Sequence, residues 1–377
     1  MLTFLKMVSR VILVLLIIIS VFLGASREGR AMVKSALFVP QVFDIGIKPL
    51  EWFTPRPIVE QVNFPVPNHV GQGDLYRPPG DGPYAAVLLF LGVDPAGSTD
   101  SRIVSLGEAL ARSNMVTLFY WSPLMRDDRM EPEDLGNLVA AFQFLTSLPY
   151  VDPTRVGMGG FCVGASFVIM AASEETIRNQ VAFVNAFGPY FDMENLIKAI
   201  SSKSTFYGDQ VHPWEPNHLT RKVYVQHLTQ DLPISEQRAL RAAFLDDRPL
   251  ELAVQGLSNE GRAVHSLLSG VPLRDTTAHL QQIGKNTQER IRHISPSNYL
   301  AGLKAPVLIM HDRNDDLVPA NESRRLADAL LKRGNVRHTE YYDIFSHVTP
   351  NLGSGLNVAV ELLKFIRHLH SIMLQAT

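Results

Sequence analysis

Short apolar runs alternate along most of the chain with stretches whose apolar residues recur at helical spacing. Residues 85–91 are continuously apolar, which is typical of a parallel strand covered on both faces. Residues 100–113 place Ile103, Leu106 and Leu110 on one side of a helix. The same alternation predicts strands at 59–64, 73–77, 115–120, 155–159 and 181–187, and helices at 132–148 and 163–172. This order predicts an α/β fold with a mostly parallel twisted sheet and helices on both faces.

The alternation stops after the strand at 181–187 and resumes near residue 295. Residues 191–294 show helical patterns without a convincing strand. The helices expected there are 235–245, 250–257, 259–268 and 277–294, and afterwards come strands at 306–310 and 338–342 and helices at 321–332 and 356–374. An insertion of this kind in a sheet domain indicates a helical cap. We therefore predict a core made of 58–190 and 295–377, with a cap at 191–294 that covers the carboxyl edge of the sheet.

The N-terminus carries a hydrophobic segment of its own. Lys6 and Arg10 precede an uncharged run over residues 11–24, which is shorter than the roughly 20 residues that a bilayer span prefers. Such a run also fits the apolar region of a secretory signal. We expect residues 1–26 to be a single-pass membrane anchor, with secretion after signal cleavage as the alternative. The proline-broken segment 27–57 is expected to be a linker.

Composition excludes several classes of function. The chain of 377 residues has a net charge of −2 and no run of basic residues, so no nucleic-acid partner is expected. Its one cysteine, Cys162, permits neither an internal disulfide nor a thiolate zinc site. The histidines are scattered, and no glycine-rich phosphate loop follows the first long strand, so we expect neither a metal nor a cofactor. Cys162 is thus either a small buried apolar residue or a reactive thiol.

The sequence around Cys162 favours the reactive thiol. Gly160-Phe-Cys-Val-Gly164 follows a predicted strand and opens a predicted helix. This is the context of the nucleophile elbow, G-x-S-x-G, with cysteine in place of serine. Flanking glycines allow the tight turn that exposes the nucleophile, and the helix N-terminus favours its thiolate form. We predict that Cys162 is a catalytic nucleophile.

A nucleophilic thiolate needs a base and a group that orients the base. Asp312, Asp315 and Asp316 follow the strand predicted at 306–310. Asp312 comes directly after the strand and is expected to shape the turn, so we choose Asp315 as the acid, with Asp316 as the alternative. His347 lies in the loop between the last strand and the last helix, which makes it the candidate base. The order nucleophile, acid, histidine is the one that this elbow requires.

The oxyanion produced by such a triad is best stabilised by backbone amides, which are fixed in place. One donor should be the N–H of Val163, directly after the nucleophile. The other should come from the loop after residues 85–91, where Val93 is the best candidate. Asp94 is adjacent, and its charge would be unfavourable there unless it points away.

With these residues identified, the chain resembles the dienelactone hydrolase group of α/β-hydrolases. The closest stretch is Val151-Asp-Pro-Thr-Arg-Val-Gly-Met-Gly-Gly-Phe-Cys-Val-Gly-Ala165, and Asp315 and His347 match the remaining triad positions. The resemblance covers roughly 60–190 and 295–375. The N-terminal segment and the large insertion are departures, so the lactone substrate of that group is not carried over.

Two classes of function follow from these residues. The first is a hydrolase of carboxylic esters or lactones, in which Cys162, Asp315 and His347 work through a thioester intermediate; an acyltransferase that uses the same thioester is a variant of it. The second is a non-catalytic, membrane-tethered binding protein. A complete nucleophile–acid–base set favours the hydrolase, because a binding protein does not need one.

Overall fold

The computed structural model describes residues 23–93, 97–250, 253–334, 336–354 and 356–377, and the side chain of Leu356 is not described. Its centre is an eight-stranded sheet in the order β1-β2-β4-β3-β5-β6-β9-β10. β2 pairs antiparallel with β1 and with β4, and the remaining neighbours pair parallel. The strands are β1 (Ile58–Pro65), β2 (Val70–Arg77), β3 (Tyr84–Phe90), β4 (Met115–Tyr120), β5 (Val151–Phe161), β6 (Val181–Phe187), β9 (Val307–Asp312) and β10 (Val336–Tyr341). The predicted mostly parallel sheet is confirmed.

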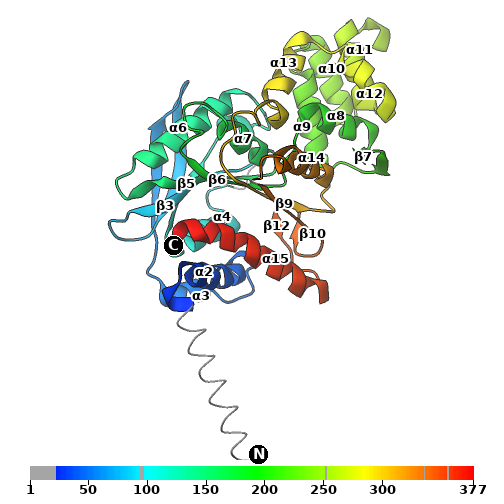
Figure 1. Cartoon of the computed structure of the whole chain (residues 1–377). Coiled ribbons are helices and arrows are strands. Elements are labelled where there is room, and N and C mark those ends of the chain that lie inside the picture. The colour runs from blue at the N-terminus through cyan, green and yellow to red at the C-terminus, as the bar shows by residue number, and fades with distance from the viewer. Residues whose placement is uncertain (1–22, 94–96, 251–252, 335, 355) are drawn as a thin grey trace, which may run out of the picture.

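Helices cover both faces of this sheet, as its apolar strands require. One face carries α6 (Glu133–Ser147), α7 (Val163–Ala171) and α14 (Ala320–Leu331), and the other carries α2 (Arg27–Val42), α4 (Ser101–Arg112) and α15 (Leu356–Met373). Figure 1 shows α2 and α15, from opposite ends of the described chain, side by side beneath the sheet. Short elements complete the core: α3 (Pro49–Phe53), α5 (Pro123–Arg126), β11 (Phe345–Ser346), β12 (Thr349–Pro350), η2 (Pro296–Asn298) and η3 (Leu374–Ala376).

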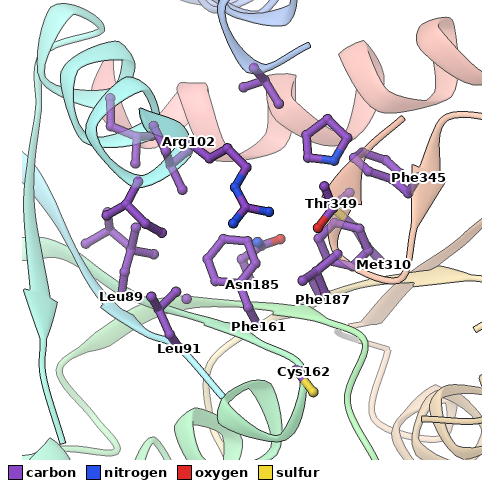
Figure 2. A pocket seen from close by; sticks show the side chains of 18 of the residues that line it. Leu89, Leu91, Arg102, Phe161, Cys162, Asn185, Phe187, Met310, Phe345 and Thr349 are labelled. Carbon is purple, nitrogen blue, oxygen red and sulfur yellow. The ribbon is translucent and has the colours of Figure 1, made fainter. Parts of the chain in front are cut away.

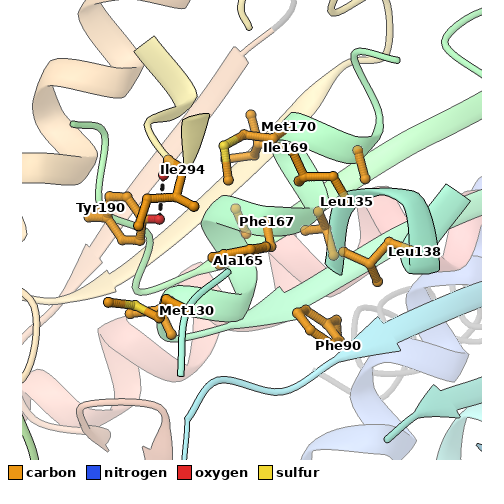
Figure 3. Close-up of a cluster of buried hydrophobic side chains, with 14 of the residues drawn as sticks. Phe90, Met130, Leu135, Leu138, Ala165, Phe167, Ile169, Met170, Tyr190 and Ile294 are labelled. Carbon is orange, nitrogen blue, oxygen red and sulfur yellow. Dashed lines mark hydrogen bonds between the residues drawn. The ribbon is translucent and has the colours of Figure 1, made fainter. Parts of the chain in front are cut away.

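Alternate residues of each strand face different helical layers. In β3, Leu88 and Phe90 pack toward α6 and α7, whereas Val87 and Leu89 pack toward α2, α4 and α15. Figure 3 shows the first of these two clusters, in which Phe90 and Phe167 are fully buried. Burial of each such side chain stabilises the fold by roughly 1.5–3 kcal/mol. The elbow between β5 and α7 is therefore fixed by apolar packing on both sides of the sheet.

The insertion between β6 and β9 is mainly helical, and Figure 1 shows its helices gathered on one side of the molecule. Its elements are α8 (Met193–Ser202), α9 (His218–Thr229), α10 (Ile234–Leu245), η1 (Val254–Gly256), α11 (Asn259–Ser269), α12 (Leu273–Leu280) and α13 (Lys285–His293). At its end, the buried hydroxyl of Tyr190 donates a hydrogen bond to the carbonyl of Ile294, 2.5 Å away (Figure 3). This contact ties the point where the chain leaves the core to the point where it returns.

The insertion differs from its predicted pattern in three places. It contains an antiparallel hairpin of β7 (Ser204–Tyr207) and β8 (Gln210–Pro213), where no strand was expected. The helix expected at 277–294 is two helices, because the chain turns at residues 281–284 before Gly284 caps α13. The helix expected at 250–257 is, within the described residues, only the single turn η1.

The prediction of a linker at 27–57 is wrong, because these residues form α2 and α3 and dock on the core. Phe38 and Leu50 are buried, and the ammonium of Lys34 donates to the carbonyls of Ser113 and Ala376, both at 2.9 Å. Pro49 indicates a break in the sequence pattern, but in the structure it begins α3. At that position the missing N–H of proline costs nothing. The predicted anchor at 1–26 falls almost entirely outside the described residues. In the part that is described, no helix is both long and apolar enough to span a bilayer.

Candidate active site

Cys162 stands at a strained turn between β5 and α7. Its φ and ψ are 56° and −137°, and its N–H donates to the carbonyl of Phe187 at 2.8 Å. The residues two positions before and after it must be glycine. A Cβ on Gly160 would lie 2.5 Å from the Cα of Ala165, and one on Gly164 would lie 2.7 Å from the carbonyl oxygen of Phe90. A positive φ at a non-glycine residue costs free energy that the surrounding packing must supply. The local geometry is that of a nucleophile elbow.

Asp315 and His347 come together in the loops that follow β9 and β10. His347 Nδ1 lies 2.5 Å from Asp315 Oδ2. The other carboxylate oxygen accepts hydrogen bonds from the N–H groups of Leu317, at 2.8 Å, and Val318, at 2.9 Å. The Asp315 side chain is completely buried, so these contacts fix its orientation. Asp316, the alternative acid, is exposed and accepts from Asn217 at 3.0 Å.

The charges of this pair favour an imidazolium–carboxylate state. Burial alone would raise the pKa of Asp315, but the neighbouring His347 and the hydrogen bond from His311 lower it below its ordinary value. Burial alone would lower the pKa of His347, but the charges of Asp315 and of Cys162 outweigh it, so that the His347 pKa is well above its ordinary value. A carboxylate that stays ionised beside the ring is what an orienting acid requires.

The other ring nitrogen of His347 is turned away from Asp315. Nε2 is buried and, among the described residues, makes no hydrogen bond of normal geometry. Cys162 is nevertheless close enough to this imidazole to raise its pKa. A loosely aligned base and nucleophile is common before substrate binds, because the contact tightens in the complex. The structure thus brings all three predicted residues, Cys162, Asp315 and His347, into one site.

Two further residues hold the site together and were not assigned this part from the sequence. Asp312 accepts from Asn314 N–H at 3.0 Å, as its expected turn role requires, but its second oxygen also accepts from the N–H of His347 at 2.8 Å. His347 has φ 56°, so this bond fixes a backbone that is otherwise unfavourable. Buried His311 lies between the carbonyl of Val318, at 2.9 Å, and the carboxylate of Asp315, at 3.3 Å. The polar residues that end β9 were the only sequence signal for these contacts.

The two expected oxyanion-hole residues line the same cavity as Cys162. Val163 begins α7, and Val93 follows β3 in the loop whose Gly92 is adjacent to the thiol. A Cβ on Gly92 would lie 2.9 Å from Cys162 Cβ and 3.4 Å from its Sγ, so only glycine lets this loop approach so closely. Asp94 falls outside the described residues. The placement is compatible with two backbone donors at one oxyanion.

Two cavities meet at Cys162. The large cavity, about 340 Å³, lies on the α2, α4 and α15 side of the sheet and is lined by Cys162 and His347 (Figure 2). The small cavity, about 40 Å³, lies on the side of the insertion and is lined by Cys162, Val163 and residues of α8 and α9. Val93 and Leu219 of α9 line both. The insertion therefore contributes walls to the space around the thiol. Within the described part of the chain, no three His, Cys, Asp or Glu side chains are grouped to hold a metal ion.

Part of the chain, including the elbow, is similar to a known protein family. Residues 123–230, which include the elbow but neither Asp315 nor His347, match the model of the dienelactone hydrolase family. The uncharacterized protein YcjY of Escherichia coli K12 is 29% identical over 131 residues, or 32% of this chain, and the match spans only 42% of that relative. A crystal structure of 2,6-dihydroxy-pseudo-oxynicotine hydrolase aligns over 84% of this chain and 68% of its own, with 14% identity and a TM-score of 0.50.

This chain has the α/β-hydrolase fold. A candidate dipeptidyl aminopeptidase IV from Bacteroides ovatus aligns over 86% of the chain and 37% of its own length, with 14% identity and a TM-score of 0.51. At such identity these structures bear on the fold alone. The resemblance of this chain to the dienelactone hydrolase group is confirmed over residues 123–230.

Proposed function

We propose that this α/β-hydrolase cleaves carboxylic esters or lactones with Cys162 as nucleophile, His347 as acid and base, and Asp315 as the group that orients His347. The observation that carries the proposal is the buried Asp315–His347 pair, 2.5 Å between Nδ1 and Oδ2, beside a cysteine held at a nucleophile elbow. Burying a carboxylate without a partner costs free energy. The buried Asp315 carboxylate is therefore stable only because several hydrogen-bond donors surround it.

The proposed reaction has two stages. The Cys162 thiolate attacks the carbonyl carbon, and the tetrahedral oxyanion accepts hydrogen bonds from the N–H groups of Val93 and Val163. The imidazolium of His347 gives its proton to the departing alkoxide, which leaves a thioester on Cys162. His347, now neutral, takes a proton from water, whose oxygen attacks the thioester and releases the acid and the Cys162 thiolate. The raised pKa of His347 suits its first task, because it keeps the ring protonated until the alkoxide forms.

The decisive experiment captures the thioester. The full chain is mixed with p-nitrophenyl esters and quenched in acid within the first turnover. It is then digested, and the masses of its peptides are measured by mass spectrometry. The acyl group should be found on the peptide that contains Cys162, and hydroxylamine should remove it. Cys162→Ala should give no acylated peptide and no turnover. Full turnover by Cys162→Ala, or an acyl group on another residue, would refute the proposal.

We also propose that residues 1–26 attach the enzyme to a membrane. The support is the sequence alone, an uncharged apolar run over residues 11–24 behind two basic residues. The docking of α2 on α15 means that such an anchor would be followed directly by the folded core, without a free linker between them.

A further inference from the structure

The large cavity is an apolar space built into the core on the side of the sheet away from α6 and α7. Val87, Leu89 and Phe183 of the strands form its floor, and α2, α4 and α15 contribute Phe38, Leu106 and Ile372 to its opposite wall. Figure 2 shows side chains of this lining, among them Leu89, Phe161 and Phe187, and Cys162, which also lines the cavity, apart from them at the elbow. A well-packed interior has few voids larger than a water molecule, so a void of about 340 Å³ next to a nucleophile indicates a binding site.

Glycine in β5 leaves part of this space open. Gly159 lines the cavity where any other residue would direct a side chain toward Leu89, since a Cβ there would lie 2.6 Å from Leu89 Cδ2. The cross-strand neighbours of Gly159 are the apolar Leu89 on β3 and the polar Asn185 on β6, and Phe187 follows Asn185 on the same face. Apart from Asn185 the floor is apolar, which suits a hydrocarbon chain.

Two polar side chains on the cavity wall, Arg102 and Asn185, already have partners. Arg102, directed inward in Figure 2, pairs with Asp100 through its Nε at 2.9 Å and its Nη2 at 2.8 Å. Asn185 Oδ1 lies 2.7 Å from Nε2 of buried His368, and burial lowers the pKa of His368 to about 3, so that this ring is neutral. A ligand that fits these walls is therefore uncharged and mostly hydrocarbon.

The position of His347 distinguishes the two halves of an ester. His347 lines the large cavity, whereas the lining of the small cavity includes Cys162 and Val163 but not His347. Under the proposed function, His347 must reach the oxygen of the leaving alcohol to protonate it. The alcohol half of the substrate then occupies the space that His347 shares, and the acyl half is left with the small cavity.

We propose that the large cavity binds the long apolar alcohol moiety of a substrate ester, and that the small cavity admits only a short acyl group. This inference rests on the proposed function for the orientation of the ester. The small cavity, at about 40 Å³, has room for about three water-sized groups. The preferred substrates are accordingly short-chain acyl esters of long, uncharged alcohols.

Isomeric esters test this preference directly. Hexyl acetate and ethyl hexanoate have the same atoms, and acid release from each is followed at constant pH with the full chain. Along the series from ethyl to octyl acetate, kcat/KM should rise about 4-fold per added methylene until the cavity is full, since each buried methylene contributes about 0.8 kcal/mol. Hexyl acetate should exceed ethyl hexanoate. A rise along the ethyl alkanoate series with a flat alkyl acetate series would overturn the inference.

A pair of variants on α4 tests the location. Leu106 lines the large cavity, whereas Val104, on the same helix and also half-buried, does not. Leu106→Trp should shorten the alcohol at which the rise stops, and Val104→Trp should leave the chain-length profile as in the wild type. Circular dichroism checks that both variants fold. Identical profiles for a folded Leu106→Trp and the wild type would contradict the assignment.

Binding of alkan-1-ols separates this inference from the proposed function. Their affinity, measured by calorimetry from butanol to octanol, should also rise about 4-fold per methylene and should weaken for the longer alcohols in Leu106→Trp. Alkanol binding without hydrolysis of any ester would refute the proposed function but support the cavity as a site for alcohol chains. Cys162-dependent hydrolysis without any alkanol binding would support the proposed function and overturn this inference.

Discussion

Replacement of Asp315 by Asn should remove most of the activity and leave the fold intact. The buried side chain can keep its two bonds from Leu317 and Val318, because the Asn carbonyl oxygen can accept them in place of Oδ1. The amide group would then face His347 Nδ1, which now lies 2.5 Å from Oδ2. An amide donor there forces Nδ1 to accept, which puts the ring proton on Nε2, toward Cys162. In that tautomer the ring cannot take a proton from the thiol.

The size of the loss follows from this change of tautomer. A triad whose acid is changed to the amide loses about 10⁴ in kcat, which corresponds to about 5 kcal/mol at 1.36 kcal/mol per tenfold. The change also removes the charge that holds the His347 pKa up, so burial should then lower that pKa. Asp316 is exposed and bonded to Asn217, so Asp316→Asn should change turnover by about twofold or less.

The assay compares both variants with the wild type on one p-nitrophenyl ester. Turnover is measured across pH, the alkylation of Cys162 by iodoacetamide gives the titration of the thiol–imidazole pair, and urea unfolding checks the fold. For Asp315→Asn, the pH dependence of Cys162 alkylation should shift, because the pKa of His347 is then lower. Turnover of a folded Asp315→Asn within tenfold of the wild type would refute the reasoning, and a larger loss in Asp316→Asn would show that the acid is Asp316.

Three further predictions concern other parts of the molecule. Iodoacetamide should modify Cys162 and abolish hydrolysis; a folded wild type whose Cys162 stays unlabelled, together with a fully active Cys162→Ala variant, would contradict the triad. Burial raises the pKa of Asp134 to about 6 in the folded state, which contributes about 3 kcal/mol of stability below pH 4 that is lost as pH rises through 6; urea unfolding of Asp134→Asn should lack this dependence. The full chain should sediment with membranes and a chain starting near Arg27, which keeps α2 and α3, should not; recovery of the unprocessed full chain in the soluble fraction would exclude the anchor, and loss of about 25 residues would indicate a cleaved signal.

The parallel core could be predicted from the sequence because its signals are local. A buried parallel strand is apolar throughout, as in β3 and β4, and the elbow needs glycines on both sides of one nucleophile. Parallel strands also carry the loops after them to one edge of the sheet. That topology is why Cys162, Asp315 and His347, far apart in sequence, could be grouped from their places after β5, β9 and β10.

Contacts that depend on long-range packing could not be predicted. Asp312 was assigned to a turn because its bond to Asn314 is local, whereas its bond to the N–H of His347 joins residues 35 apart. The segment 27–57 failed for a related reason. Its prolines indicate a break, but packing of α2 on α15 and α4 explains why residues such as Phe38 are buried there. Propensity is a weak guide when tertiary packing supplies most of the stability of a helix.

The glycines of β5 and of the first turn of α7 have two separate purposes. Gly160 and Gly164 permit the turn at Cys162, since a Cβ on either would meet backbone atoms. Gly157 and Gly159 face the other way, where a Cβ would meet the ring of Phe183 or the side chain of Leu89. An elbow needs only the first pair. The second pair leaves room for large side chains on the α15 side of the sheet, and Gly159 also lines the large cavity. The run Gly157-Met-Gly-Gly160 therefore connects the nucleophile to the cavity that we propose it uses.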